Sequence, residues 1–397
     1  MRWRFGGAAL VTLLAGGVAA GFAGTAAHAD PVSSTALAGV GGDGLQDVFD
    51  AYAGAAPTPP SANTVFYTPL HSSSATNNVT IQSFDAYPAG GSVAAPGCIT
   101  TKSGGPAFDR PSSSGNGTTA LAAAVNGTNW VQSTASCTGT GVNVTGQLDW
   151  VRSASQPKTS GSTLTWIPFA RDATVFAYFD HGTNTIQHLT TAQLTALYSS
   201  SSGTLTIAGD TVEACLPLAG SAVRKNAEAA IGVTDSQANT AANAVSCNNL
   251  DQNGGNTFYN TVSSLPSGTD AVFPFTAASW IAQANHTAED RSNTARANGV
   301  DLASIDSLGK PYTGTSPNLD GNDNYYTSST YGNNVYVVVP TNKISGFTKN
   351  AALVSLFSGS TSQICSAAAN ATANTFGFND LTAGEGTCGS TTLTGNS

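Results

Sequence analysis

The sequence predicts an α/β fold. Short apolar segments with strand character alternate along the chain with segments whose apolar residues have helical spacing. The run VYVVVP at Val335–Pro340 is almost wholly apolar, which is typical of a strand buried on both faces of a sheet. The chain has 397 residues, of which 40% are hydrophobic, so it can bury a sizeable core and form more than one domain.

Each element follows from a local pattern. The segment LTTAQLTALYSS (Leu189–Ser200) has a threonine N-cap with glutamine three residues beyond Thr190, which predicts a helix. The expected strands include Thr35–Val40, Val79–Phe84, Leu164–Pro168, Val175–Phe179 and Tyr336–Pro340. The expected helices include Gly44–Tyr52, Thr118–Val125, Thr191–Tyr198, Val223–Ile231 and Ala277–Ala284. Residues 53–64, 100–117 and 309–334 are rich in Gly, Ser, Pro and Asn, which predicts surface loops.

Charged residues are scarce. They make up 9% of the chain, against roughly 25% in a typical soluble domain. The formal net charge of −9 argues against a broad nucleic-acid-binding surface and against docking to an anionic membrane. We therefore expect a monomer whose partners are small solutes rather than nucleic acid.

The N-terminus predicts export. Two arginines within Met1–Arg4 precede a small apolar run from Phe5 to about Ala23, and Ala27-His28-Ala29 forms an A-x-A cleavage site before Asp30. We expect residues 1–29 to be a secretory signal peptide, and we expect no membrane span after its removal. The remaining chain has 12 basic and 23 acidic residues, a net charge of −11. It would be secreted and either free or associated with the cell wall.

Six cysteines remain after cleavage. An even number in an exported protein predicts three disulfides, for which the sequence alone allows 15 connectivities. The spacing suggests that neighbours pair, as Cys98–Cys137, Cys215–Cys247 and Cys365–Cys388. A zinc site is the competing hypothesis. It is disfavoured because the chain has no C-x-x-C and its histidines are scattered.

A strand, a Gly/Ser-rich turn and a helix start recur in the same order. The four examples are Leu37–Phe49, Asp109–Leu121, Cys215–Val233 and, more weakly, Val272–Asn285. Amides at a helix N-terminus have no intrahelical acceptor and carry partial positive charge, so they bind anions. Any one of these turns is more simply a loop, but four of the same form predict an anion site.

Four arginines lie close to these turns in the sequence: Arg110, Arg152, Arg171 and Arg224. A guanidinium can hold a tetrahedral oxyanion through paired hydrogen bonds, whereas a surface arginine can simply cover an apolar face. Arg171 can also pair with the neighbouring Asp172. For Lys225 and Arg291 we favour the surface interpretation.

Catalytic signals are weak. The chain has no G-x-S-x-G elbow and no H-E-x-x-H motif, although carboxylate pairs for glycoside hydrolysis remain open because they are spatial. NLDGND at Asn318–Asp323 lacks full calcium-loop spacing and is interpreted as a solvated turn. The tryptophans at positions 130, 150, 166 and 280 are expected in the core.

The order of these segments resembles extracellular substrate-binding proteins of the type 2 periplasmic-binding fold, and among them the phosphate-binding proteins of ABC transporters. The matching segments are Leu37–Tyr52, Leu148–Ser155, Trp166–Tyr178, Leu189–Ser200, Leu216–Val233 and Val335–Pro340. The resemblance implies two α/β lobes joined by a hinge, with the ligand in the cleft between them. Lobe one would comprise residues 30–168 and 272–397, and lobe two residues 169–271.

The resemblance also implies ligand-binding positions. These are Gly42, Asp43 and Gly44 in the first turn, Ser153 in RSAS, and Ser221 with Arg224 in the third turn. The predicted site also includes Ser114 in the second turn, Arg110, Arg152, Arg171 and Asp172.

Two departures from the family pattern concern the ligand. Gly-Ser-Gly-Thr is replaced by Gly-Ser-Ala-Val at residues 220–223, which removes a hydroxyl donor. The aspartate expected after the second cleft strand is absent from Ser153-Ala154-Ser155. That acid would accept the proton of hydrogen phosphate, and Asp43 or Asp172 is a possible substitute.

Three hypotheses follow. The first is a secreted solute-binding protein that captures a phosphate-like oxyanion, without chemistry or cofactor, and hands it to an ABC transporter. The second is a wall-associated binding or adhesion module of the same fold that has lost anion binding. The third, ranked last, is an extracellular hydrolase.

Overall fold

The computed structural model describes residues 36–54, 67–72, 79–88, 96–132, 137, 140–181, 186–382 and 386–397. The predicted signal peptide and most of the predicted loop 53–64 lie outside the described residues. Within the described part of the chain, every helix is too short or too polar to cross a membrane.

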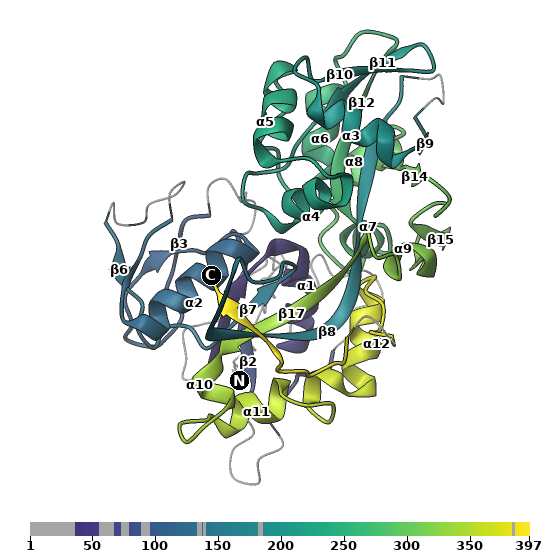
Figure 1. Cartoon of the computed structure of the whole chain (residues 1–397). Helices are drawn as coiled ribbons and strands as arrows, with labels where there is room; N and C mark the ends of the chain where they lie inside the picture. The colour runs from purple at the N-terminus through teal and green to yellow at the C-terminus, as the bar shows by residue number, and fades with distance from the viewer. Residues whose placement is uncertain are drawn as a thin grey trace, which may run out of the picture.

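The chain forms two α/β lobes connected by long strands (Figure 1). Strand β8 (Thr159–Phe179) has 21 residues and runs from one lobe into the other. Strand β17 (Gly332–Pro340) runs back antiparallel to β8, pairing from Gly332–Ala173 to Pro340–Leu164. The two-lobed α/β architecture expected from the sequence is therefore confirmed.

The first lobe is built on the strand order β2-β1-β7-β17-β8, with β18 also paired to β8. Strand β1 lies parallel to both β2 and β7. Separate apolar clusters pack the sheet, one around Phe49 and Trp150 and one around Leu121 and Trp166. The remaining elements are β1 (Leu37–Gly41), η1 (Asp43–Leu45), α1 (Gln46–Tyr52), β2 (Ile81–Ser83), β3 (Cys98–Ile99), β4 (Phe108–Asp109), α2 (Ser114–Asn126), β5 (Asn129–Trp130), β6 (Val142–Asn143), β7 (Trp150–Ser153), α10 (Thr341–Ile344), α11 (Ala351–Phe357), η2 (Gln363–Cys365), α12 (Ala367–Thr375) and β18 (Leu393–Asn396).

The second lobe continues the sheet in the order β10-β11-β12-β8, with β13 paired to the far end of β8. One apolar cluster fills it. Its elements are β9 (His188–Leu189), α3 (Thr191–Ser199), β10 (Thr204–Ile207), β11 (Asp210–Ala214), α4 (Ala222–Ile231), α5 (Asp235–Ala244), α6 (Gly255–Val262), β12 (Thr269–Thr276), α7 (Ala277–Ala284), α8 (Asn293–Ala297), β13 (Asp301–Leu302), β14 (Ser304–Ile305), β15 (Tyr312–Thr315), β16 (Asn318–Gly321) and α9 (Asp323–Tyr326).

The predicted lobe boundary at residue 272 differs from the observed core. Val272, Trp280, Leu302 and Tyr325 all pack in the cluster of the second lobe. The chain does not return along β12, because β13 and β14 that follow it pair with β8 and β9 of the same lobe. Helix α7 contacts both lobes, since Ala278 and Ala282 pack in the first-lobe cluster around Phe49, and β17 is the strand that returns to the first lobe.

Local predictions agree in part with the structure. The strands expected at residues 164–168 and 175–179 are one strand, because residues 169–174 stay extended and pair with β17 and β12. The capping box of Thr190 and Gln193 is confirmed at the start of α3. Residues 100–117 and 309–334 are not simply loops, since the first contains β4 and the start of α2, and the second contains β15, β16 and α9.

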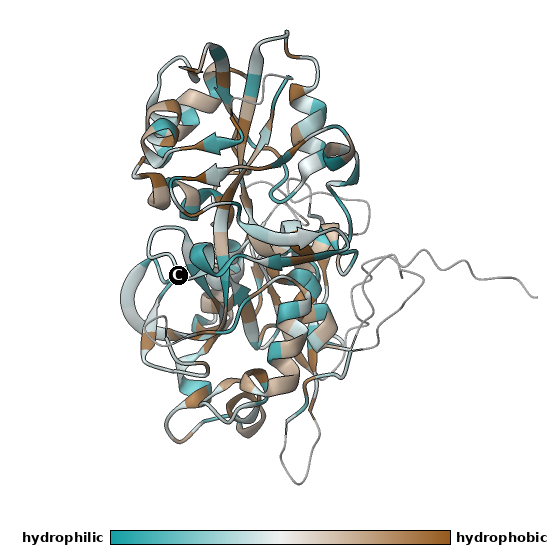
Figure 2. Ribbon diagram, turned by 90° about the vertical axis from the view of Figure 1, so that its right-hand side faces the viewer, coloured by the Kyte–Doolittle hydropathy of each residue, from teal (hydrophilic) through white to brown (hydrophobic). Residues whose placement is uncertain are grey.

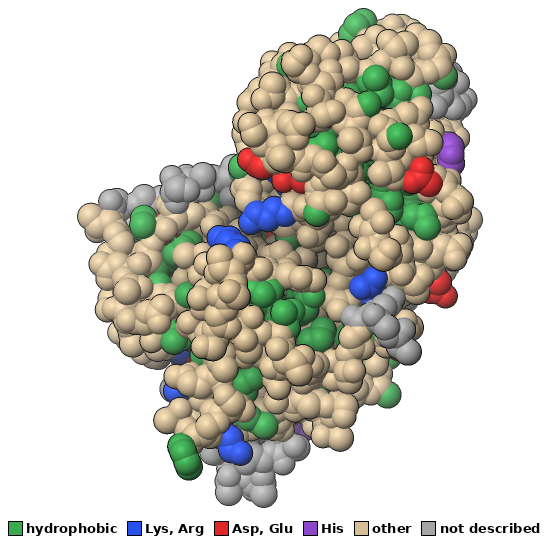
Figure 3. Space-filling model, viewed as in Figure 1, with side chains coloured by type: hydrophobic (Ala, Val, Ile, Leu, Met, Phe, Trp, Pro, Cys, Tyr) green, Lys and Arg blue, Asp and Glu red, His purple; other side chains and the backbone are tan. Residues whose placement is uncertain are grey.

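Hydrophobic residues lie on the strands and on the inward faces of the helices in both lobes (Figure 2). The four tryptophans expected in the core are 0–5% exposed. The face of the molecule shown in Figure 3 is mostly uncharged, and several charged side chains on it gather where the two lobes meet.

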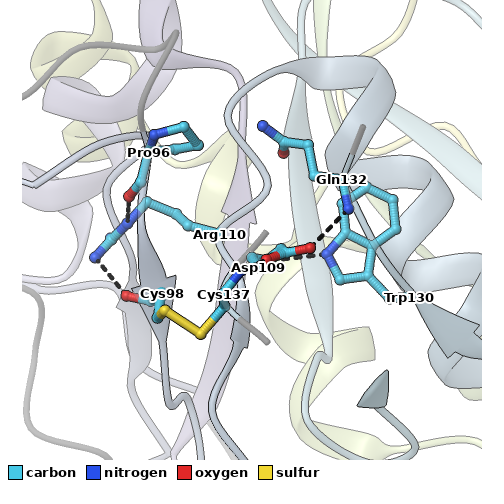
Figure 4. The surroundings of a disulfide bond; sticks show 7 residues. All are labelled: Pro96, Cys98, Asp109, Arg110, Trp130, Gln132 and Cys137. Atoms are coloured by element: carbon cyan, nitrogen blue, oxygen red, sulfur yellow. Dashed lines mark hydrogen bonds between the residues drawn. A yellow bond between two sulfur atoms is a disulfide. The ribbon is translucent and has the colours of Figure 1, made fainter. Parts of the chain in front are cut away.

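All three predicted disulfides are present. Around Cys98–Cys137, Asp109 accepts a hydrogen bond from the amide of Gln132 and from that of Cys137 (Figure 4). Arg110 donates to the carbonyl oxygens of Pro96 and Cys98. The guanidinium thus stabilises the disulfide-bonded loop.

We predict that Gly39→Ala destabilises the first lobe. A Cβ at Gly39 in β1 would lie 2.0 Å from an indole carbon of the buried Trp150, so the core must shift. Overpacking of this kind costs about 1–3 kcal/mol, which would lower the urea midpoint.

Gly115→Ala is the matched control, because the added carbon would meet neighbours at 3.5 Å or more. Its midpoint should equal or slightly exceed that of the wild type. An unchanged midpoint for Gly39→Ala would contradict the close packing of β1 on Trp150.

Candidate functional site

A small cavity lies between the two lobes. The first lobe contributes the turn at residues 42–45, Ser114 at the start of α2, and Ala154 after β7. The second lobe contributes Ala222 and Val223 at the start of α4, Thr276 before α7, and the loop residues Gln252 and Asn253, while Asp172 comes from β8. The cavity volume is about 20 Å³, enough for about one water molecule.

Small residues bring the first-lobe elements together. A Cβ at Gly42 would lie 2.7 Å from the hydroxyl of Ser114, so glycine lets the first turn approach the start of α2 without displacing that hydroxyl. A Cβ at Gly117 would lie 2.9 Å from the Cα of Gly41, and this brings α2 onto the end of β1. The Gly/Ser composition of the two turns thus places them against one cavity.

Helices α2 and α4 belong to opposite lobes, and both begin at the cavity. Ser113 caps α2 by accepting from the amide of Asn116, and Ser221 caps α4 by accepting from the amide of Arg224. The first-turn amides that precede these capped positions have no intrahelical acceptor. Each helix therefore directs partial positive charge at the cavity.

Two buried carboxyl groups also line the cavity. Asp43 is 3% exposed, and burial raises its pKa to about 6 despite the opposing effect of Arg291. Asp172 is 4% exposed, and burial raises its pKa to about 7 although the amides of Ala278 and Ala173 donate to its Oδ1. The side chain of Asp172 thereby caps the N-terminus of α7.

Asp43 also connects the two lobes. Its Oδ2 lies 3.2 Å from Nη2 of Arg291, which follows α7. The Arg291 guanidinium lies 5.1 Å from the centroid of the Tyr87 ring in the first lobe. The surface role expected for Arg291 is therefore wrong, because its charge is used in a contact between the lobes.

Three of the predicted arginines make structural contacts instead of lining the cavity. Arg152 is fully buried and donates to the carbonyl oxygens of Gly42 and Phe84 and to the hydroxyl of Ser83. Arg224 is fully buried and pairs with Glu228 and Asp235. Arg110 stabilises the disulfide-bonded loop. Among the described residues that line this cavity, none is lysine or arginine.

Arg171 lies in a second, larger cavity of about 970 Å³, between β17 and the C-terminal half of α4. Its guanidinium donates to the carbonyl oxygens of Tyr326 and Ser328 and to Oδ1 of Asn334. Arg171 and Asp172 have opposite orientations because successive strand residues point to opposite faces.

The predicted serines have different positions. Ser114 lines the cavity, and its hydroxyl accepts from the amide of Ala154. The hydroxyl of Ser153 donates to the carbonyl of Ser155, and that of Ser221 caps α4. The structure therefore brings together Gly42, Asp43, Gly44, Ser114 and Asp172, and leaves the other predicted side chains outside the cavity lining.

The sequence analysis missed three polar residues that line the cavity, which are Gln252, Thr276 and, most notably, Asn253. Asn253 is fully buried and lines the cavity, and its Nδ2 has no hydrogen-bond partner. The only local signal is the Asn-Gly dipeptide of a turn, and Asn253 does have a positive φ of 53°. That signal predicts a turn and gives no indication of a ligand.

No family model and no curated protein matches the chain. Comparison with solved structures finds several chains of low sequence identity and modest TM-score. A Clostridium perfringens protein, described as a phosphate ABC transporter substrate-binding protein and solved with bound phosphate, has 10% identity and a TM-score of 0.44, covering 87% of this chain and 100% of that one. PstS from Borrelia burgdorferi has 10% identity and a TM-score of 0.41, covering 87% and 99%. An ABC-type phosphate transport receptor from Vibrio cholerae has 12% identity and a TM-score of 0.36, covering 59% and 81%.

We predict that Asp172→Asn flattens the pH dependence of stability. The pKa of Asp172 is raised from 3.8 to about 7 in the folded protein, so its stabilising contribution is complete below about pH 4 and is lost as the pH rises to about 7. The loss is on the order of 4 kcal/mol. Asparagine keeps the Oδ1 acceptor for the amide of Ala278 but does not titrate.

The measurement is the free energy of unfolding by urea across this pH range. Asp320→Asn, at an exposed carboxyl outside the cavity, controls for the loss of one acid. A variant at Asp172 with the wild-type slope would show that this carboxyl is not the titrating group.

Proposed function

We propose that the chain is a solute-binding protein that captures a small protonated oxyanion of the phosphate type between its lobes. One observation carries the proposal: the starts of α2 and α4, from opposite lobes, meet at one buried cavity together with the unpaired amide of Asn253. Backbone amides at helix starts favour anions without needing a basic side chain. Closure of the two lobes would bury such a ligand.

The two carboxyl groups favour an oxyanion that carries a proton. A carboxylate repels a fully ionised anion but accepts a hydrogen bond from the P–OH group of hydrogen phosphate. Sulfate has no proton to donate at neutral pH. Asp43 and Asp172 line the cavity and can perform the acceptor role that Ser153-Ala154-Ser155 does not.

Ligand access requires the lobes to separate. The cavity of about 20 Å³ accommodates about one water molecule, whereas a tetrahedral oxyanion has four oxygen atoms of similar size. Strands β8 and β17 cross between the lobes and are the natural hinge. A ligand would enter the open form and be enclosed on closure.

The three disulfides fit an oxidising compartment. With the predicted signal peptide, they support an exported protein. Transfer of the captured solute to an ABC transporter is part of the same proposal, and cell-wall association stays a prediction.

We predict that phosphate binds and that sulfate binds at least about tenfold more weakly, because sulfate leaves the carboxyl acceptors unpaired. The preference for phosphate over sulfate should be larger at about pH 8 than at about pH 6, because protonation of Asp43 and Asp172 turns these acceptors into O–H donors that sulfate can also use. The measurement is calorimetric titration of residues 30–397, refolded to remove carried-over ligand.

Thermal melting provides the second measurement, since a bound ligand raises the melting temperature by mass action. Neutral sugars serve as the negative control. If no oxyanion releases heat or shifts the melting temperature at millimolar concentration, the proposal fails and the second hypothesis, a module that has lost anion binding, replaces it.

A further inference from the structure

The side-chain amide of Asn253 is oriented by contacts on one side only. Its Oδ1 accepts from the amide of Thr276 at 3.1 Å and from the Thr276 hydroxyl at 3.2 Å. Its backbone carbonyl accepts from Nε2 of Gln283 at 2.9 Å. Because the oxygen of the planar amide is bound to the start of α7, the nitrogen must point the other way.

That direction leads to the first lobe. Nδ2 of Asn253 lies 3.0 Å from the Cβ position of Gly44, in the turn that lines the cavity. A side chain at Gly44 would displace this amide, and glycine leaves the space open. The nitrogen is buried and has no partner, and buried donors are almost always paired in native structures. A ligand atom in the cavity would supply the missing acceptor.

Asn253 offsets the loss of a hydrogen-bond donor elsewhere in the cavity. Val223 lines the same cavity at the position where the resembling family has a threonine, so a hydroxyl donor is absent from the start of α4. Asn253 lies in the loop before α6 and presents two N–H donors to that space. A donor lost from one element of the second lobe is thus offset by a donor from another.

We propose that Asn253 is the side chain that binds and selects the ligand, donating from Nδ2 to an oxygen of the enclosed oxyanion. This inference rests on the proposed function. It assigns anion recognition to a neutral carboxamide and backbone amides, in place of the arginines that the sequence suggested. Such a site binds through hydrogen bonds of defined direction, so it requires a ligand whose acceptor oxygen faces Asn253 while its P–OH group faces Asp172 or Asp43.

Asn253→Asp is the direct test because the two side chains have the same shape. Aspartate keeps an oxygen for the amide of Thr276 and tolerates the positive φ, but it replaces the donor with a second acceptor. Phosphate affinity should fall by about a hundredfold or more, since a hydrogen bond to a charged ligand is lost and repulsion is added.

Asn285→Asp is the matched control. Asn285 at the end of α7 also makes two hydrogen bonds, to the backbone of Leu319, and lies outside the cavity lining. It adds the same charge to the same lobe, so it should lower the melting temperature while leaving phosphate affinity within about threefold.

Val223→Thr provides a rescue that a purely structural role for Asn253 would not show. As a single substitution, Val223→Thr adds a hydroxyl at the start of α4 and should bind phosphate more tightly than the wild type does. Combined with Asn253→Asp, it should restore part of the phosphate affinity that Asn253→Asp loses.

The outcomes separate this inference from the proposed function. If the wild type binds phosphate and Asn253→Asp binds it within about threefold, the role of Asn253 is wrong and the function stands. If the wild type binds no oxyanion, the function fails and the inference fails with it. Retained near-ultraviolet circular dichroism in Asn253→Asp excludes misfolding as the cause of lost affinity.

Discussion

The antiparallel pairing of β8 with β17 is the constraint on which the rest of the molecule depends. At about 3.4 Å per residue, the 21 residues of β8 extend for about 70 Å, long enough to belong to both sheets. Since β17 pairs with β8 across the crossing, the connection between the lobes is a two-stranded ribbon. The alternation of side chains along β8 then directs Asp172 to the small cavity and Arg171 to the large one.

The buried Arg152 is used to order the backbone. Acidic residues outnumber lysine and arginine 23 to 14, so this use does not follow from a lack of acidic partners. Arg152 donates to Gly42 and Phe84, and this contact joins the first turn to the end of β2. Such an arginine orders the turn whose amides line the cavity. It therefore contributes to the site through the backbone rather than through its charge.

The sequence predicted those features that depend on local chemistry. VYVVVP predicted a buried strand because its apolar run has no polar face, and neighbouring cysteines paired because each closes a loop of tens of residues. The shared cavity was anticipated because Gly/Ser turns before helices have recognisable patterns.

Features that depend on tertiary pairing were not predictable. The point at which the chain returns to the first lobe depends on the pairing of β13 with β8 in the second lobe. A strand of two residues, such as β13, leaves no recognisable pattern in a sequence. The role proposed for Asn253 depends on the orientation of its side-chain amide, which is determined by Thr276, 23 residues later in the sequence. Arg291 forms its ion pair with Asp43, which lies 248 residues earlier in the sequence.

The contact between Asp43 and Arg291 determines how closure and binding are related. Asp43 lies in the turn that would hold the ligand, and Arg291 approaches it from the second lobe. The two residues meet in the arrangement of the lobes described here, so an opening that separates the lobes would break the ion pair. Asp43 also accepts from the amide of Gly44, a donor that an anion would otherwise use. Under the proposed function, an entering anion would therefore compete with a carboxylate of the protein for the same turn. A ligand shifts the balance between the open and closed forms only by the difference in its affinity for them. Competition with Asp43 would therefore lower the net affinity for the anion. It would favour an anion whose own proton can be shared with Asp43 over an anion that can only displace the carboxylate.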